Sequence, residues 1–333
     1  MTEPVIPRAA RLLSVASPDK VKRAGTVRRT VDTSPHDGRK PEWLKIKARM
    51  GDNYRDLTGL VADQGLATVC QQARCPNIFE CWEMREATFL IGGEDCTRRC
   101  GFCQIKTGKP ASYDTDEPRR VAESVKQMGL RYAVVTMVAR DDLDDGGAWL
   151  VAETIRQIRG AVPGCGVEVL PSDFGYGHDQ VAGLTALDQV VDAEPDVFAF
   201  NVETPRRLYP KIRPAFDYDR SMEFLQAARD RMPAATAIKS NIIVGMGETD
   251  DEVVEVLRDL RAHGVQLVTI GQYLQPSDLH VHLDRYVTPE QFAEYKRVGE
   301  QELGFDHIES GPMVRSSYHA GKQAIDAGAW TPP

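Results

Sequence analysis

Six of the seven cysteines gather in two groups of three within 34 residues of the 333-residue chain. In chain order the two groups are Cys70, Cys75 and Cys81, and then Cys96, Cys100 and Cys103. A disulfide framework would spread cysteines through a small secreted domain. Clustered thiols in a chain of this length instead indicate metal or iron–sulfur ligation.

The spacing within each group separates zinc from iron–sulfur. Structural zinc sites usually present paired Cys-x2-Cys knuckles that together give four ligands. Neither group supplies two such pairs, and three thiolates do not close a tetrahedral structural site. Three thiolates do suit a [4Fe–4S] cluster with one iron left free for another ligand, like the open position of a catalytic zinc site. The spacing therefore favours iron–sulfur sites and leaves zinc as the alternative.

The second group lies in the run CTRRCGFC, where Phe102 precedes the last cysteine. Cys-x3-Cys-x2-Cys with an aromatic residue at this place resembles the signature of the radical S-adenosylmethionine (SAM) superfamily. The resemblance implies that Cys96, Cys100 and Cys103 hold a [4Fe–4S] cluster whose open iron is chelated by SAM. It also implies a SAM-derived 5′-deoxyadenosyl radical, and it says little about the substrate.

Around and after these cysteines, strand and helix patterns alternate. Apolar, β-rich runs predict six strands, at 87–91, 132–138, 167–170, 197–202, 238–244 and 267–273. Helical periodicity is found between and after them, at 118–128, 147–159, 179–187, 206–212, 220–231, 250–263 and 289–303. Strands that alternate with helices of 10–15 residues are typical of parallel βα units. We therefore predict an α/β fold, a partial (β/α)6 TIM-like barrel of the radical SAM kind.

Polar side chains follow the predicted strands, where barrel enzymes place their chemistry. Thr136 lies near the end of the second strand, Asn201 and Glu203 end the fourth, and Lys239 belongs to the fifth. Any solvated strand end is polar too, so the structural interpretation of each residue stays open. Asn201 and Glu203 are the preferred contacts to SAM. The full predicted SAM site is Phe102, Thr136, Asn201, Glu203, Arg213 and Lys239.

Two further motifs resemble one family within the superfamily. The Cys-x4-Cys-x5-Cys spacing of the first group, in VCQQARCPNIFECW, is similar to the auxiliary-cluster motif of the lipoyl synthase family, and RSSY at 315–318 is similar to its terminal motif. Other matching runs are ATFLIGG, CTRRCGFCQI, RDDLDDGGA, NVET, KSN, GETDDEV and QYLQPS. The resemblance extends from about Trp43 to Tyr318 and does not include the chain before Trp43.

This resemblance implies a sulfurtransferase that inserts two sulfur atoms, at C6 and C8 of a protein-bound octanoyl-lysine. Those carbons carry no acidic proton, so a side-chain base cannot activate them, and a SAM-derived radical is the available route. The resemblance further implies a second, auxiliary [4Fe–4S] cluster that supplies the sulfur. Its ligands would be Cys70, Cys75, Cys81 and a serine oxygen, Ser317 or alternatively Ser316, with Arg315 close to it.

The chain departs from the family pattern in a few loops. Pro205 follows NVET where valine is usual, Asp144 replaces a usual proline, and 171–174 interrupts a usually contiguous Pro-Asp-Phe. These departures touch loops near the substrate face, so they bear on fine substrate geometry and not on the reaction class.

The resemblance also implies partners. They are octanoylated lipoyl carrier domains (2-oxoacid dehydrogenase E2 subunits and the glycine cleavage H protein), a ferredoxin- or flavodoxin-type electron donor, and an iron–sulfur carrier protein. Two other classes stay open: a radical SAM enzyme with another substrate, and a non-catalytic iron–sulfur protein. Cleavage of SAM by the reduced protein would exclude the latter.

Charge is unevenly distributed along the chain. Residues 1–50 hold 12 Lys and Arg against 5 Asp and Glu, whereas the whole chain has a net charge of −8. The basic head is a solubilising tail, an arm that docks on an acidic partner, or a transit peptide. Further candidate docking charges are Arg206, Arg207, Lys211 and Arg213.

Composition gives the remaining expectations. The net negative charge argues against a general nucleic-acid binder. No run approaches the ~18 apolar residues of a membrane helix, and the start lacks the apolar segment of a secretory signal. We expect a cytoplasmic protein with four segments: a basic arm (1–42), an extension with the auxiliary cysteines (43–86), the barrel (87–304) and a tail (305–333).

Overall fold

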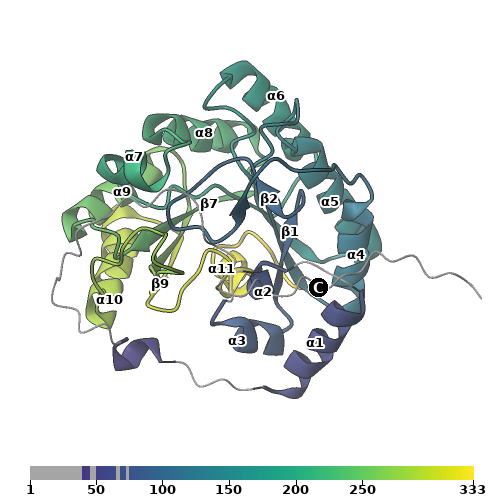
Figure 1. Cartoon of the computed structure of the whole chain (residues 1–333), viewed down its shortest axis with the longest axis horizontal. Helices are drawn as coiled ribbons and strands as arrows, with labels where there is room; N and C mark the ends of the chain where they lie inside the picture. The colour runs from purple at the N-terminus through teal and green to yellow at the C-terminus, as the bar shows by residue number, and fades with distance from the viewer. Residues whose placement is uncertain (1–39, 46–49, 65–67, 73–74) are drawn as a thin grey trace, which may run out of the picture.

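Seven parallel strands form one sheet in a computed structural model that describes residues 40–45, 50–64, 68–72 and 75–333 (Figure 1). In spatial order the strands are β1 (Ala87–Ile91), β4 (Tyr132–Met137), β5 (Gly166–Leu170), β6 (Val197–Ala199), β7 (Ala237–Val244), β8 (Leu267–Gln272) and β9 (His307–Gly311). Spatial order equals chain order, so each crossover adds a strand beside the previous one. The predicted basic arm lies outside the described residues except for its last three.

The sheet confirms the predicted α/β fold but has one more strand than the six predicted. β9 comes from the segment predicted as a tail, and it pairs with β8 through the register Ile308↔Val268. Its sequence, HIESG, contains one aliphatic residue, so it has no apolar run from which a strand could be predicted. Backbone pairing with β8, rather than side-chain pattern, makes this segment a strand. The fourth predicted strand is also shorter than expected, since β6 ends at Ala199.

Helices cover the outside of the sheet, as the arc in Figure 1 shows. They are α4 (Glu117–Gln127), α5 (Ala148–Ala161), α6 (Gln180–Val191), α8 (Tyr218–Arg231), α9 (Asp250–Ala262) and α10 (Pro289–Arg297). Each buries one apolar face, as α4 does with Val121 and Val125 while Arg119 stays exposed. α9 begins with a capping box in which Thr249 and Glu252 bond each other's backbone N–H.

Two predicted helices change type along their length. The 206–212 segment is a 3-10 turn, η3 (Arg206–Leu208), followed by the short α7 (Tyr209–Ile212). The 289–303 segment leaves α-helical geometry at Val298 and continues as a π-helical turn, η4 (Val298–Leu303). Gly304, with φ 73°, ends it in the left-handed conformation that glycine adopts without a Cβ penalty.

The extension before β1 consists of η2 (Glu42–Leu44), α1 (Asp52–Gln64), α2 (Val69–Gln72) and α3 (Ile78–Glu83). In Figure 1, α1 and α3 lie on the side of the barrel between α10 and α4. Leu57 and Trp82 are fully buried in the main core, and an isolated antiparallel bridge joins Thr68 to Phe89 of β1. The auxiliary cysteines are therefore carried by a segment fixed to the first strand.

The last helix, α11 (Ala320–Asp326), lies near the middle of the ring of strands and helices in Figure 1. Its Ala320 and Ala324 form a buried cluster with Val197 and Leu267, which begin their strands. The predicted tail is thus part of the barrel's own core, at the N-terminal ends of the strands. Within the described residues no helix is both long and apolar enough to cross a membrane.

Candidate active site

The Cys-x3-Cys-x2-Cys motif occupies a loop that leaves the C-terminal end of β1. Gly92 and Gly93 open it with φ of 86° and 96°, a conformation that residues with a Cβ rarely adopt. Two short strands, β2 (Asp95–Cys96) and β3 (Lys106–Thr107), pair and close the loop on itself. Cys96, Cys100 and Cys103, the predicted ligands, therefore lie on one cluster loop, which we define as residues 92–109.

Arg98, within the cluster loop, anchors the loop to neighbouring segments. It was not among the predicted site residues. Its guanidinium is buried and donates to Asp141 at 2.6 and 2.9 Å. It also makes an ion pair with Asp173 at 2.7 Å and lies 4.4 Å from the ring centroid of Phe216. The double Arg run in CTRRC was the available signal, but only the fold separates buried Arg98 from exposed Arg99.

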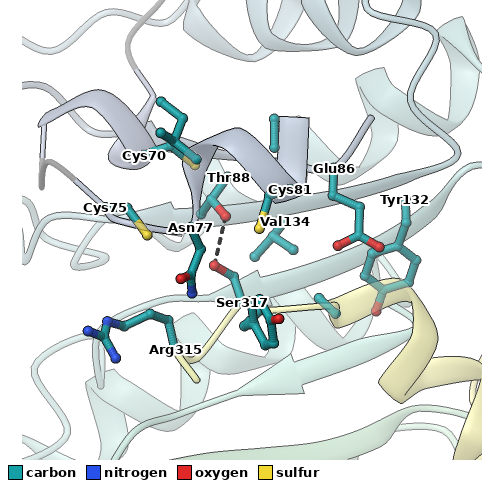
Figure 2. Close-up of a pocket in the computed structure, with 14 residues that line it drawn as sticks. Cys70, Cys75, Asn77, Cys81, Glu86, Thr88, Tyr132, Val134, Arg315 and Ser317 are labelled. Atoms are coloured by element: carbon teal, nitrogen blue, oxygen red, sulfur yellow. Dashed lines mark hydrogen bonds between the residues drawn. The ribbon is translucent and has the colours of Figure 1, made fainter. Parts of the chain in front are cut away.

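The first cysteine group lines a small cavity between the extension and the C-terminal segment (Figure 2). Cys70, Cys75 and Cys81 come from α2, the turn after it and α3. Ser317 and Arg315 reach the same cavity from the segment between β9 and α11. The structure thus gathers the three predicted auxiliary thiols, the preferred serine and the predicted arginine around one space.

Hydrogen bonds fix the C-terminal segment in this place. The hydroxyl of Thr88 in β1 donates to Ser317 Oγ at 2.9 Å, the dashed line of Figure 2. Asn77 donates to the Met313 carbonyl at 2.6 Å, and the Tyr318 hydroxyl donates to Glu80 at 3.1 Å. The RSSY segment is therefore attached both to the extension and to the first strand.

A second cavity, of about 500 Å³, connects the two cysteine groups. Its lining includes Cys103 from the cluster loop, Cys70 and Cys75 from the extension, and both Ser316 and Ser317. Ser317 alone of the two serines also lines the small cavity with the three auxiliary thiols. One space thus reaches both predicted cluster sites.

The polar wall of the large cavity is built around Glu203, which is buried and has φ of 68°. Asn201 donates to one carboxylate oxygen at 2.9 Å and Asn241 to the other at 2.5 Å. Burial raises the pKa of Glu203, while the nearby Arg213 guanidinium and the two amides favour its charged form. A fixed buried carboxylate of this kind suits the hydroxyl and ammonium groups of a nucleoside and an amino acid.

Asn241 was not among the predicted site residues, although it stands in the matching KSN run. It lines the large cavity and accepts a hydrogen bond from Thr269 at 2.7 Å. Phe102, Asn201 and Glu203, which were predicted, line the same cavity. The second half of β7 and the segment after β6 therefore form one wall of the cavity.

Three of the predicted SAM contacts, Thr136, Lys239 and Arg213, have other partners. Lys239 in β7 is buried, and its ammonium group donates to Glu168 in β5 at 2.8 Å. The Thr136 hydroxyl donates to the Leu170 carbonyl at 2.9 Å. Neither side chain lines the large cavity, so the structure does not bring these two residues together with the other predicted SAM contacts.

Arg213 lies behind the polar wall instead of in front of it. Its guanidinium is buried 3.8 Å from the ring centroid of Phe216 and donates to the backbone carbonyl of Asn201 at 2.5 Å. A second bond at 3.2 Å reaches the Tyr209 hydroxyl. The structure places Arg213 as a support for the Asn201–Glu203 turn and not as an exposed docking charge.

The other proposed docking charges divide in two. Arg206 is ion-paired with Asp219, and Arg207 with Glu252 at 2.7 Å, so these two charges are already compensated. Lys211 is exposed and has no ion pair within the part of the chain that the structure describes.

The thiols fit iron–sulfur ligation chemically. All six are free, and burial raises the pKa of Cys70, Cys81 and Cys100, and that of Cys103 to about 12. Such thiols ionise when iron compensates their charge. Among the described residues, no group of three His, Cys, Asp or Glu converges closely enough for a single ion. A cluster places its irons at separate corners, so its ligands need not meet at one point.

Comparison with known proteins decides the family. Residues 90–260 match the Radical SAM superfamily. The chain is 57% identical over 291 residues to the lipoyl synthase of Nocardia farcinica, covering 87% of this chain and 80% of that one. It is equally identical over 284 residues to the lipoyl synthase of Kineococcus radiotolerans, covering 85% and 82%. The chain belongs to the lipoyl synthase family.

Solved structures agree on the fold of this lipoyl synthase family member. The FeFe-hydrogenase maturase HydG from Carboxydothermus hydrogenoformans matches with a TM-score of 0.55 at 15% identity, over 73% of this chain and 56% of that one. Methylornithine synthase (PylB) matches with a TM-score of 0.51 at 16% identity, over 74% and 72%. Radical SAM fold, sulfur-inserting enzyme class and family, all predicted from sequence, are confirmed. The superfamily implies one [4Fe–4S] cluster and SAM.

Proposed function

We propose that this enzyme inserts sulfur at C6 and C8 of an octanoyl-lysine on a carrier domain, using two [4Fe–4S] clusters. Cys96, Cys100 and Cys103 would hold the cluster that binds SAM. Cys70, Cys75, Cys81 and Ser317 would hold the auxiliary cluster. The observation that carries the proposal is the cavity of about 500 Å³ that is lined by Cys103 of one cysteine group and by Cys70 and Cys75 of the other.

When bound, these groups supply the radical that removes a hydrogen atom from an unactivated carbon, and the sulfur that replaces it. The chain itself binds and orients the substrate. Apolar side chains of Ile105, Ile243, Leu274 and Val314 line the cavity. They would hold the methylene chain and exclude water, which protects a reactive carbon centre.

The polar wall would position SAM. Asn201, Glu203 and Asn241 form one hydrogen-bonded unit whose carboxylate is buried. Phe102 lies beside it on the cluster loop. Arg213, behind the wall, would keep Asn201 in place through its backbone carbonyl.

Ser317 is the preferred oxygen ligand over Ser316, because it alone shares the small cavity with the auxiliary thiols. A hard hydroxyl oxygen matches thiolate-ligated iron poorly, so this corner would be the weakest. Thr88 would hold the Ser317 oxygen in position. Burial lowers the pKa of Arg315, and nearby Cys75 opposes this shift, so thiolate charge there favours the charged guanidinium.

The remaining partners belong to the proposal as well. Radical generation needs an external electron, here from a ferredoxin- or flavodoxin-type protein. Repeated turnover needs an iron–sulfur carrier protein to restore the auxiliary cluster. The carriers would be E2 subunits of 2-oxoacid dehydrogenases and the glycine cleavage H protein. Because thiolate ligands stay reduced in the cytoplasm, we propose that location. We also propose the division into a basic arm (1–42), an extension (43–86), the barrel (87–304) and a C-terminal segment (305–333). β9 and α11 join this last segment to the barrel.

The test is anaerobic reconstitution with iron and sulfide, followed by SAM, a strong reductant and an octanoylated lipoyl domain. Intact mass of the carrier should show a gain of two sulfurs, with one 5′-deoxyadenosine formed for each. The variant Cys75→Ala should still form 5′-deoxyadenosine but transfer no sulfur. The matched control Cys165→Ala, at a buried cysteine outside both groups, should transfer normally.

Two results would contradict the proposal. Formation of 5′-deoxyadenosine without sulfur gain in the unaltered protein would assign it to another radical substrate. No cleavage of SAM at all would leave a non-catalytic iron–sulfur protein.

A further inference from the structure

The large cavity opens between segments that are exposed at the surface. Lys40 and Gln104 line the cavity and are exposed, and the loop 274–284 after β8 contributes Leu274 and Pro276. This loop is joined to the cluster loop. His280 Nε2 lies 3.2 Å from the Cys103 carbonyl oxygen. Residues 102–105 of the cluster loop line the cavity as well. We define the rim as these two loops (94–109 and 274–284) together with Lys40 and Lys211, although only part of it lines the cavity itself.

Lys211 belongs to the rim through the backbone of the cluster loop. The Gly101 N–H donates to the Ile212 carbonyl at 2.7 Å, and the Val281 N–H donates to the Gly101 carbonyl at 2.9 Å. A Cβ on Gly101 would stand 3.3 Å from the Lys211 carbonyl oxygen. The cluster loop, α7 and the loop after β8 are therefore one continuous surface at the cavity mouth.

The rim carries uncompensated positive charge. Its exposed basic side chains without an ion pair, within the described part of the chain, are Lys40, Arg99, Lys109 and Lys211. Lys106 is already paired with Asp95 at 2.6 Å. The other acidic side chains of the rim are Glu94, Asp278 and Asp284, so these four basic groups stand against three acidic ones. The balance of these charges is positive, although the whole chain has a net charge of −8.

The chain before Lys40 adds to this asymmetry by composition. Those 39 residues hold eight Lys and Arg against four Asp and Glu, and they join the described chain at the cavity mouth. On the same rim Leu279 exposes 73% of its surface. One exposed leucine is ordinary alone, but on a surface that also carries four basic side chains it offers an apolar contact to a docked protein.

We propose that the rim is the docking surface for the folded carrier domain, and that it recognises an acidic patch beside the acyl-lysine. Leu279 would provide the apolar contact, and Lys40, Arg99, Lys109 and Lys211 the charge complementarity. This inference rests on the proposed function. A carrier must send its modified lysine into the cavity, so its surface has to meet the border of the opening. An acidic electron donor has no such need, which favours the carrier as occupant.

The experiment compares two substrates of the reconstituted enzyme: an octanoylated carrier domain and a short octanoyl-lysine peptide. The double variant Lys109→Glu/Lys211→Glu reverses two rim charges, and Lys126→Glu is the matched control. Lys126 is exposed in the last turn of α4, whose C-terminal end leads to the start of β4 and so away from the rim. Iron content of all variants is measured first, so that only loaded enzymes are compared.

We expect the double variant to raise the KM for the carrier domain by about tenfold while the peptide reacts as with Lys126→Glu. Calorimetry with the carrier lacking its octanoyl group should show the same loss of affinity, and added salt should reduce the difference. Leu279→Ser should weaken carrier binding severalfold without changing the salt dependence.

Each other outcome is informative. Equal KM values for the rim variant and Lys126→Glu would overturn the docking surface, as would equal losses on carrier and peptide. A changed response to a reduced ferredoxin-type donor, with carrier KM unchanged, would assign the rim to the donor instead. If the unaltered enzyme transfers sulfur to neither substrate, the proposed function fails, and that result is separate from a failure of docking.

Discussion

At the residue scale, the serine oxygen proposed for the auxiliary site is positioned by a partner far away in sequence. Thr88 and Ser317 are 229 residues apart and share a hydrogen bond of 2.9 Å. Thr88 belongs to strand β1, and its hydroxyl is on a short side chain. The hydrogen bond therefore holds Ser317 close to the sheet. Ser317 is therefore held at the small cavity that the three auxiliary thiols line.

Substitution of Ser317 by cysteine tests the weak-corner idea. A thiolate is a better ligand for this iron than a hydroxyl oxygen, so Ser317→Cys should keep its iron but lose sulfur transfer by about tenfold or more. Formation of 5′-deoxyadenosine should persist. Iron analysis and intact mass of the carrier measure both effects. Normal transfer at C6 and C8 would contradict the prediction, and a stronger effect of Ser316→Cys would assign the ligand to Ser316.

The two neighbouring arginines of the cluster loop, Arg98 and Arg99, allow a second test at this scale. Arg98→Met leaves Asp141 and Asp173 without their buried guanidinium, which should lower the free energy of unfolding by about 3 kcal/mol. Arg99→Met removes an exposed side chain and should change it by less than about 0.5 kcal/mol. Unfolding of the reconstituted proteins in guanidinium chloride gives both values. Equal losses for the two variants would show that the buried position of Arg98 is unimportant.

At the element scale, strand β8 has to let the C-terminal segment pass close to it. A Cβ at Gly271 would lie 2.1 Å from the carbonyl oxygen of Val314. Val314 directly precedes the RSSY segment, and both residues line the large cavity. The absence of a side chain at Gly271 therefore lets the RSSY segment approach the sheet and bring Ser317 to the cavity that the auxiliary thiols line.

Gly271→Ala should force this segment away from the strand. Overpacking of this kind costs about 1–3 kcal/mol of unfolding free energy. The enzyme should also bind less auxiliary iron, because Ser317 is displaced. Gly59→Ala is the control, since no atom lies within 4 Å of a Cβ there and alanine favours the helix, so stability should rise by up to about 1 kcal/mol. Full iron loading of Gly271→Ala would refute the prediction.

At the scale of the whole molecule, charge is separated along the chain. Residues 1–50 are basic, and the remainder is strongly acidic. The described chain begins at the cavity mouth with Lys40. A macromolecular substrate with an acidic surface would be drawn to that mouth and repelled from the rest of the enzyme, which favours productive encounters.

Removal of residues 1–39 should therefore raise the KM for the carrier domain and flatten its dependence on salt, because fewer charges act on the encounter. Turnover of a short octanoyl-lysine peptide should not change. Steady-state kinetics at low and physiological salt measure the effect. Unchanged constants for the carrier would assign the head to solubility alone.

The local sequence was sufficient for several parts of the site. Three thiols within eight residues, Cys96 to Cys103, can be recognised as ligands because their loop is set by short-range spacing. Alternating apolar runs and helical periodicity predicted the parallel α/β fold, because each βα unit buries its own apolar face. Asn201 and Glu203 were predicted from their place after a strand, and both line the large cavity.

Tertiary structure decided what depends on partners distant in sequence. Lys239 does not line the large cavity, because it is bound to Glu168, on another strand, at 2.8 Å inside the barrel. Arg98 and Arg99 are neighbours of the same type, and only packing buries one and exposes the other. β9 has no apolar pattern and exists because β8 offers an edge. Sequence fixes which groups can do the chemistry, since ligand type is a local property. Which of them face the same cavity depends on long-range contacts, since a side chain's solvation and partners are set only once the chain has folded.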